Sequence, residues 1–348
     1  MTRSTAINIP SSGRIDPATL SSGPLVTTYY VNPLMKTGNA QMFNLTVQRQ
    51  LGNTLSLEAG YVAALSHNLS YQLGNINYVS ATGSNGSINP NLGIIQELTD
   101  LGAGNYNALQ MKFTKRESRN LSFLLSYTYS HNLDNGAAPF DAGQNNDLPQ
   151  DPNNLRAEWA SSDADVRHNM VFSGLYRLPI GHGQQFFSSW SRPMELAFGG
   201  WQINSIYTMR SGTPVNVVNQ PNSKAPNNFR PNLVGNPNLP RSKRTLQEYF
   251  NTAAFVPVYD TKGNPLPGDA GRNIVTGPGY INLDFSLFKE FAITERYKLQ
   301  TRLETFNTLN TPHFENPGGN TTDTTHYGQI TSAQNNPREI QIAAKFLF

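Results

Sequence analysis

The chain has 348 residues, of which 14% are charged and 37% are hydrophobic, with no cysteine and a formal net charge of +3. This charge is too weak to indicate nucleic-acid binding, and the absence of cysteine excludes disulfides and thiolate chemistry. No run approaches the roughly 18 apolar residues of a transmembrane helix, so closed strands are the only means by which this sequence could span a bilayer.

The first 40 residues differ from the rest of the chain. Residues 1–40 are rich in Ser, Thr, Pro and Gly and keep no sustained period, so we expect a loop or the remnant of an N-terminal region. From residue 41 onward, apolar and polar residues alternate in segments with the two-residue period of β-strands. Segments 41–51 and 54–62 are separated by Gly-Asn at 52–53, which predicts a hairpin.

Seven later segments alternate in the same way, which brings the number of predicted strands to nine. They are residues 106–115, 121–130, 168–178, 200–210, 281–291, 297–307 and 338–348. The connections between the nine strands are alternately long and short, as in transmembrane barrels with short periplasmic turns and long extracellular loops. We therefore predict an all-β fold, the portion of an antiparallel transmembrane β-barrel. Because single-chain bacterial barrels have an even number of strands, we expect an open, partial barrel.

The last strand gives the clearest pattern. Its apolar face carries five residues that end on an aromatic: Ile340, Ile342, Ala344, Phe346 and Phe348. The closing edge of a soluble sandwich would also alternate, but soluble strands usually have about 5–6 residues, whereas about 9–11 are needed to cross a bilayer. The length of this strand favours the barrel.

Several stretches resemble one known family in their order and spacing. They are residues 47–50 (VQRQ), 58–62 (EAGYV), 150–158 (QDPNNLRAE), 162–168 (SDADVRH), 250–255 (FNTAAF), 271–274 (GRNI), 277–279 (GPG), 282–289 (NLDFSLFK) and 304–310 (ETFNTLN). Together they resemble the C-terminal barrel region of TonB-dependent outer-membrane receptors, of the type that carries an N-terminal carboxypeptidase-regulatory-like domain. The resemblance implies that residues 41–348 form this part of the barrel in the outer membrane of a Gram-negative type of cell.

The resemblance also implies a function and partners. The family takes up ligands too large for porins, such as siderophores or oligosaccharides, with force supplied by the TonB complex. The plug domain, the TonB-contacting segment and the signal peptide of the family have no counterpart here; the first 20 residues lack the apolar region of a signal. We therefore expect the TonB complex to be contacted through a region upstream of this chain. Besides the outer-membrane lipid, the barrel-assembly machinery is an expected partner, and its signal would be Ile342, Ala344, Phe346 and Phe348.

Two groups of polar residues are candidates for the site. Three fall on polar strand faces and are expected to face the lumen: Asp284, Arg302 and Glu304. Six others are expected to order an outer loop through charge-assisted hydrogen bonds: Asp151, Arg156, Asp163, Asp165, Arg167 and His168. Four carboxylates of that loop, Asp147, Asp151, Asp163 and Asp165, could also bind calcium, although EF-hand spacing is absent.

No catalytic motif is present in the sequence. It contains no His-Glu-x-x-His zinc site, no Gly-x-Ser-x-Gly elbow, no P-loop and no dinucleotide fingerprint, so we predict neither an enzyme nor a cofactor. An alternative function is a secreted or surface β-rich adhesin or carbohydrate-binding protein with no transport role. Its apolar faces would form one dry core, and it would be soluble without detergent.

Overall fold

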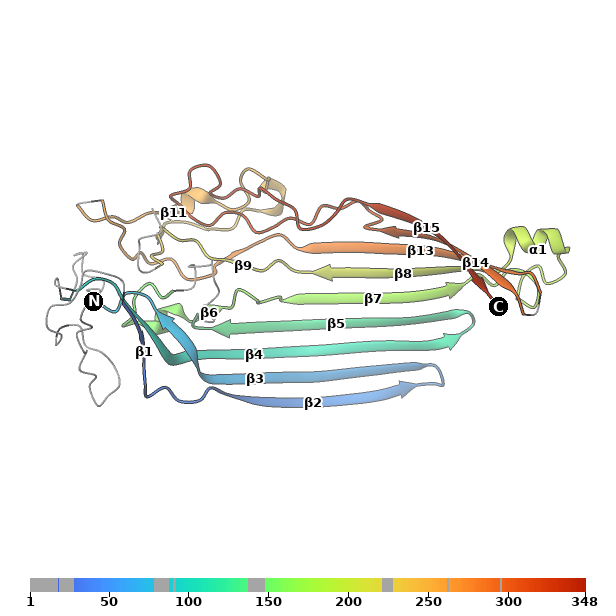
Figure 1. The fold of residues 1–348 in the computed structure, drawn as a ribbon, viewed down its shortest axis with the longest axis horizontal. Helices are drawn as coiled ribbons and strands as arrows, with labels where there is room; N and C mark the ends of the chain where they lie inside the picture. Colours follow the sequence, from blue (N-terminus) through green and yellow to red (C-terminus); the bar gives the residue numbers. More distant parts are fainter. Residues whose placement is uncertain are drawn as a thin grey trace, which may run out of the picture.

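The computed structural model describes residues 18, 28–77, 88–89, 92–136, 148–220, 228–261, 263–294 and 296–348. Nine long strands lie side by side in one antiparallel sheet (Figure 1). In spatial and sequence order they are β2 (Asn39–Leu51), β3 (Leu55–Leu73), β4 (Ile95–Ser118), β5 (Leu121–Asp134), β7 (His168–Arg177), β8 (Trp201–Arg210), β13 (Tyr280–Ala292), β14 (Lys298–Phe306) and β15 (Glu339–Leu347).

The number of strands and their order confirm the prediction from the alternating pattern. Each strand pairs with its sequence neighbours, and in the described part of the chain no strand pairs with the outer side of β2 or β15. The sheet is therefore open, as expected. The expected lengths of two strands were wrong, because β3 continues to Leu73 and β4 already begins at Ile95. The outer halves of both strands still form ladder hydrogen bonds, with register shifts beyond Ser66, so paired strands continue through residues that were expected as loop.

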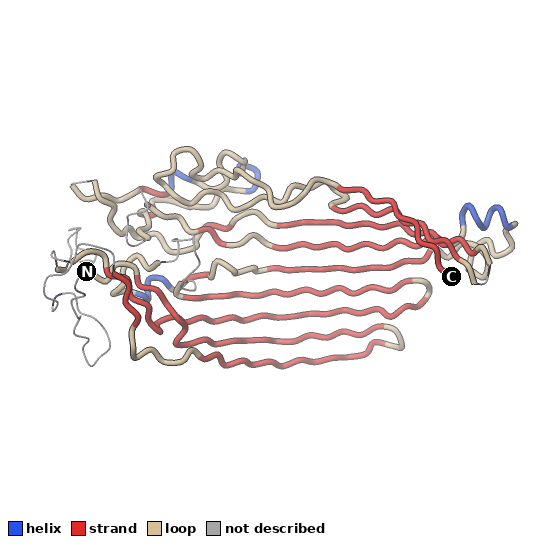
Figure 2. The backbone as a smooth tube through the Cα atoms, viewed as in Figure 1, coloured by secondary structure: helices blue, strands red, loops and turns tan. Residues whose placement is uncertain are grey.

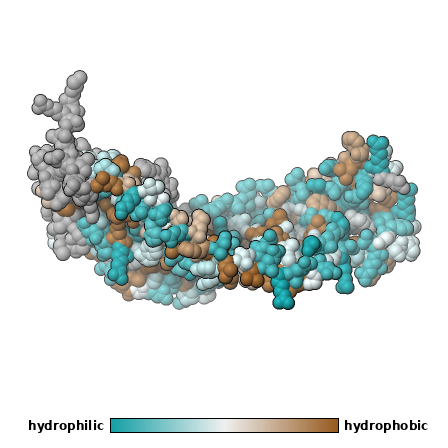
Figure 3. Space-filling model, turned by 90° about the horizontal axis from the view of Figure 1, so that it is seen from below, coloured by the Kyte–Doolittle hydropathy of each residue, from teal (hydrophilic) through white to brown (hydrophobic). Residues whose placement is uncertain are grey.

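The hydrogen-bond register places the apolar positions of all nine strands on one face. For example, Leu287 of β13 pairs with Leu303 of β14, and Leu303 pairs with Ile342 of β15. One continuous apolar row across β5–β15 consists of Leu121, Tyr176, Ile203, Leu287, Leu303 and Ile342. The opposite face has a mainly polar row, Gln48, Glu58, Lys112, Ser126, Val171, Thr208 and Asn282. Figure 3, seen from the β2 edge, shows hydrophobic surface along the strands.

The long connections gather at one end of the sheet and the short turns at the other (Figure 2). The loop end contains short strands: β1 (Thr28–Val31), β6 (Ala160–Ser161), β9 (Pro214–Val215), β10 (Asn232–Leu233), β11 (Phe255–Val256) and β12 (Val275–Thr276). It also contains 3₁₀ turns at Leu155–Glu158, Arg241–Lys243 and Thr252–Ala254. Helix α1 (Arg192–Phe198) lies at the short-turn end, beside the C-terminus (Figure 1).

The hydrophobic clusters lie at the loop end, because no described element forms a second layer over either face of the sheet. One hydrophobic cluster consists of Val215, Val217, Phe250, Ala254, Phe255, Ala270 and Val275. A second consists of Tyr71, Leu73, Ile76 and Ile95, at the outer ends of β3 and β4. Among the described residues, no helix is both long enough and apolar enough to cross a bilayer.

One expectation for the connecting segments was wrong. Within the segment expected as loop, residues 28–31 form β1, which pairs in parallel with β4. Tertiary contacts here decide the conformation of sequence without a clear period.

Candidate functional site

The three candidate lumen residues lie on the polar face of β13 and β14. Phe288 pairs with Arg302 and Ser286 pairs with Glu304, and Asp284 continues the same side of β13. Arg302 donates to Gln300 Oε1 at 2.7 Å and lies 5.0 Å from the Phe288 ring centroid, and no described ion pair joins it to Glu304 or Asp284. The structure therefore places the three residues on one face but does not assemble them into a cluster.

A buried ion pair joins two outer loops that are distant in sequence. Arg230 Nη1 lies 2.5 Å from Glu158 Oε2, and both side chains are almost completely buried, at 3% and 2% exposure. Gln150 completes the arrangement: its backbone N–H donates to Glu158 Oε1 at 3.0 Å, and its Oε1 accepts from the Arg230 N–H at 2.6 Å. Arg230 Nε also donates to the Ala270 carbonyl at 2.8 Å. A buried pair is tolerated only when its remaining polar atoms are satisfied in this way.

A second arginine connects the same loops to the sheet. Arg272 is buried, pairs with the Asp134 carboxylate at the end of β5, and donates Nε to the Glu158 carbonyl at 3.0 Å. Its neighbour Asn273 donates Nδ2 to Asp163 at 2.5 Å and to the Ser161 carbonyl at 2.7 Å. The Arg272-Asn273 pair therefore fixes the 268–276 segment against β5 and β6. We had not singled out Arg230, Glu158 or Asp134, because their partners are 72 and 138 residues away and no local pattern marks them.

A third polar group lies where the outer loop enters β7. The buried Asp165 carboxylate accepts from Arg167 Nε at 2.9 Å and from the Asn132 backbone N–H at 2.8 Å, and its Oδ2 lies 3.1 Å from His131 Nδ1. His168 contacts Tyr127 OH through Nδ1 at 2.8 Å. The structure thus brings Asp165, Arg167 and His131 together at the start of β7.

The other outer-loop candidates lie apart from this group. Asp151 accepts from the Asn153 backbone N–H within its own turn, and Arg156 is exposed on a 3₁₀ turn. Asp147, a candidate calcium ligand, lies outside the described residues. Within the described ranges, no group of three or more His, Cys, Asp or Glu has the geometry to hold a metal ion.

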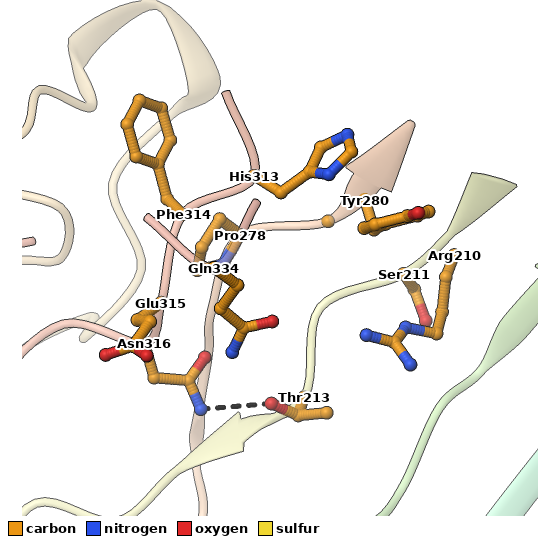
Figure 4. Close-up of a pocket in the computed structure, with 11 residues that line it drawn as sticks. Arg210, Ser211, Thr213, Pro278, Tyr280, His313, Phe314, Glu315, Asn316 and Gln334 are labelled. Atoms are coloured by element: carbon orange, nitrogen blue, oxygen red, sulfur yellow. Dashed lines mark hydrogen bonds between the residues drawn. The ribbon is translucent and has the colours of Figure 1, made fainter. Parts of the chain in front are cut away.

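A polar cavity opens where the polar face meets the loops. Its volume is about 380 Å³, and Arg210 and Tyr280, cross-strand partners at the ends of β8 and β13, form one wall (Figure 4). The Arg210 guanidinium carbon lies 5.5 Å from the centroid of the Tyr280 ring. The centroid of the His313 ring lies 3.9 Å from the same Tyr280 centroid. His313 donates Nε2 to the Ile281 carbonyl at 2.7 Å, which fixes the orientation of its ring.

The opposite wall of the cavity comes from the last long loop. Asn316 donates Nδ2 to Thr213 Oγ1 at 3.0 Å and to the Pro214 carbonyl at 3.2 Å, and this contact joins the loop after β8 to the loop before β15 (Figure 4). Glu315 and Gln334 also line the cavity. The cavity therefore offers one guanidinium, one carboxylate, two amides and aromatic faces, which is a set suited to binding a polar ligand.

The four candidate assembly residues share one edge of the sheet. Ile342 and Phe346 are exposed on the apolar face of β15, and Phe348 lies immediately beyond the end of the strand. Phe346 stacks with Tyr297 at 5.8 Å and with Phe348 at 6.4 Å. Ala344 lies on the same face, paired with Thr301 of β14.

The sequence matches the family described as outer membrane beta barrel domain over residues 2–341. No curated protein sequence matches it.

Several solved structures match most of the chain at low sequence identity. The outer membrane transporter YddB from Escherichia coli is 11% identical, with 90% of this chain and 33% of that chain covered and a TM-score of 0.47. The ferripyoverdine receptor of Pseudomonas aeruginosa is 10% identical, with 91% and 28% covered and a TM-score of 0.47. The FrpB iron transporter from Neisseria meningitidis is 12% identical, with 92% and 32% covered and a TM-score of 0.41. The chain thus spans about a third of the length of the solved structures it matches.

Proposed function

Because the chain belongs to the outer membrane beta barrel domain family and is located in the outer membrane, we propose that it forms the C-terminal part of a TonB-dependent transporter barrel. In this proposal, further strands of a longer protein close the sheet between β2 and β15. The ligand is too large for a porin, such as a siderophore or an oligosaccharide. The TonB complex acts through a region upstream of this chain.

The observation that carries the proposal is the separation of the sheet into one apolar and one polar face across all nine strands. A soluble adhesin would cover its apolar face with a second layer, whereas here the interior clusters lie in the loops at one end. The apolar face then contacts lipid, and the polar face lines the lumen. Asp284, Arg302 and Glu304 are accordingly proposed to be lumen-facing residues that contact a plug or a passing ligand.

The loop end is proposed to be the extracellular, ligand-facing end. Buried contacts of Arg230, Arg272 and Asp165 order the loops. The cavity lined by Arg210 and Tyr280 lies where these loops meet the polar face. A preformed polar cavity lowers the entropic cost of binding. We propose that Arg210 contacts an anionic or hydroxyl-rich part of the ligand there.

The test is energised uptake by the full-length protein. Cells that express it are supplied with ⁵⁵Fe-loaded catecholate and hydroxamate siderophores and with fluorescent oligosaccharides, with and without a functional TonB complex. We expect accumulation of one of these ligands only when TonB is functional. We also expect Arg210→Gln to raise the concentration for half-maximal uptake by about ten- to 150-fold, since a charge-assisted contact contributes about 1.5–3 kcal/mol. Passive passage of these probes that is independent of TonB would contradict the proposal, as would a soluble, monomeric full-length product.

A matched variant distinguishes a ligand contact from a structural effect. Arg177 is also exposed at the end of a strand, but it lies at the short-turn end of β7 and pairs with Glu117. Arg177→Gln is therefore expected to leave the half-maximal concentration unchanged. An equal loss in both variants would show that Arg210 is not a specific contact.

The C-terminal aromatic has a separate proposed role. We propose that Ile342, Ala344, Phe346 and Phe348 form the signal that the barrel-assembly machinery recognises. Removal of Phe348 should lower the amount of full-length protein in the outer membrane, measured by immunoblot of membrane fractions, while synthesis is unchanged. An unchanged amount in the membrane would contradict this role.

A further inference from the structure

The connection between β7 and β8 differs from the other connections at the short-turn end. It runs from residue 178 to residue 200 and contains α1, whereas β2–β3 and β4–β5 are joined by two or three residues. Its apolar side chains are exposed to a large degree, including Phe187 at 58% and Phe198 at 57%. We call these residues the α1 patch: Phe186, Phe187, Trp190, Met194, Leu196 and Phe198.

The α1 patch is an ordered surface. The Trp190 ring stacks on Phe187 with centroids 4.6 Å apart and meets Phe198 edge-on at 5.9 Å. Glu195 accepts from the His182 backbone N–H at 2.9 Å, which holds the helix against the preceding turn. An exposed apolar group of this size on an ordered segment indicates a contact surface.

Lys289 fixes the α1 patch to the apolar face of the sheet. Lys289 belongs to the apolar side of β13, together with Leu287 and Phe291, yet its side chain is only 3% exposed. Its Nζ donates to the Ala197 carbonyl in the last turn of α1 at 3.1 Å and to the carbonyl of the C-cap residue Gly199 at 2.6 Å. The ammonium therefore caps the helix C-terminus, where the free carbonyls and the helix dipole favour a cation.

The same ammonium is enclosed by aromatic rings of the apolar face. Lys289 Nζ lies 4.7 Å from the Trp201 ring centroid and 5.1 Å from that of Phe291. A charge on a lipid-facing surface is costly unless it is paired in this way. Since Trp201 and Phe291 belong to the apolar face, the C-terminal end of α1 lies on that face of the sheet and not on the polar one.

We propose that the α1 patch inserts into the inner leaflet of the outer membrane at the boundary of headgroups and acyl chains, and that α1 is an interfacial anchor of the barrel. Three observations select phospholipid as the occupant. The patch is continuous with the apolar face through Lys289, Trp201 and Phe291; it is dominated by Phe and Trp; and it lies at the short-turn end, where barrels carry an aromatic girdle. This proposal depends on the outer-membrane location of the chain and not on transport. The lipid contact of the α1 patch and the proposed transport function can therefore fail independently in their tests.

The experiment measures the depth of single spin labels in the full-length protein, reconstituted in phosphatidylethanolamine/phosphatidylglycerol bilayers. This chain has no cysteine, so single cysteines in it can be labelled once any cysteine elsewhere in the protein is replaced. Labels are placed at Phe187→Cys and Met194→Cys in the α1 patch. Leu303→Cys on the apolar face is the lipid-exposed control, and Asn53→Cys in the exposed β2–β3 turn is the water-exposed control at the same end.

We expect both patch labels to collide preferentially with oxygen, as at Leu303, and the Asn53 label to collide preferentially with a water-soluble nickel chelate. Nickel preference at both patch positions would overturn the proposal. So would protection from both reagents, which would mean that a protein surface covers the patch.

A second variant tests the anchoring role of Lys289. Lys289→Met removes the donor to the α1 carbonyls but keeps an apolar side chain of similar length. We expect the Met194 label to shift towards nickel accessibility and to gain mobility in this variant, while the Leu303 label is unchanged. No change at Met194 in the Lys289→Met protein would overturn the assignment of Lys289 as the residue that positions α1.

Discussion

The Arg230–Glu158 pair allows a quantitative prediction for the outer loops. Both side chains are almost fully buried, and their contact joins segments 72 residues apart. Replacing Arg230 by Met keeps most of the volume but leaves the Glu158 carboxylate in a buried site with the Gln150 N–H as its remaining described donor. The expected cost is about 3–5 kcal/mol, the range found when one partner of a buried ion pair is removed.

This cost should appear as local opening of the loops, because the strand ladders do not depend on the pair. Hydrogen exchange of residues 148–160 and 228–233, measured by mass spectrometry on the protein in bilayers, reports this opening. Since about 1.4 kcal/mol corresponds to a factor of ten, protection in both segments should fall by roughly two to three and a half orders of magnitude. Protection within β13 and β14 should remain unchanged.

An exposed ion pair in the same chain provides the control. Arg177 Nη1 and Glu117 Oε1 are 2.6 Å apart, almost the same distance as in the buried pair, but the side chains are 54% and 48% exposed. Exposed pairs contribute about 0–1 kcal/mol, so Arg177→Met should change protection near it by less than tenfold. The reasoning is refuted if Arg230→Met and Arg177→Met give losses of the same size, or if Arg230→Met affects only one of the two joined segments.

Three further predictions concern the loops and the two faces of the sheet. Burial raises the pKa of the Tyr327 phenol, whose oxygen has no described hydrogen-bond partner. The contribution of Tyr327 to loop stability is therefore fully present below about pH 10, the ordinary pKa of tyrosine, and is lost at higher pH. Tyr327→Phe should remove this contribution to the pH dependence and stabilise the loops by about 1 kcal/mol, as measured by hydrogen exchange at several pH values. A Cβ at Gly268 would overlap neighbouring backbone, so Gly268→Ala should destabilise the loops by about 1–3 kcal/mol in denaturant titrations, whereas Gly235→Ala, whose added Cβ would meet the Ala254 Cβ at an ordinary contact distance of 3.8 Å, should be neutral. Leu303→Lys should destabilise the protein in bilayers by about 2–4 kcal/mol near the midplane, and Glu304→Lys on the adjacent, opposite face should have little effect; equal effects would contradict the assignment of the faces.

The sheet could be predicted from the sequence because its information is local. Alternation of apolar and polar residues over nine or ten positions, as in Glu339–Leu347, determines both the strand and the face of each side chain. The short turns then determine the neighbours of each strand. The outer halves of β3 and β4 were missed because polar residues interrupt the alternation, at His67 in β3 and at Asn105 and Asn107 in β4. The outer half of β4 is paired by β1 and β3, which only the tertiary structure reveals.

The loop end could be predicted only in part. Asp165 and Arg167 are two residues apart and could be paired by inspection, whereas Arg272 and Asp134 are separated by 138 residues. A charged residue in a polar loop carries no local sign that it will be buried. The cavity wall has the same limitation, since Arg210 and Tyr280 become neighbours only through the register of β8 and β13.

The strands, which follow from a local sequence pattern, and the loops, which depend on long-range contacts, should differ in their tolerance to substitution. A substitution in a strand is judged by its face, so Leu303 can be exchanged for other apolar residues while the fold is retained. The outer loops have no such freedom at Arg230, Arg272 and Asp165, because each of these side chains satisfies partners from more than one segment. Between these fixed points, the exposed loop positions carry no such constraint. Under the proposed function, ligand preference is therefore expected to change most readily at the cavity rim at Gln334, whereas the Glu315 carboxylate also accepts from Ser332 Oγ at 2.6 Å and is less free to vary.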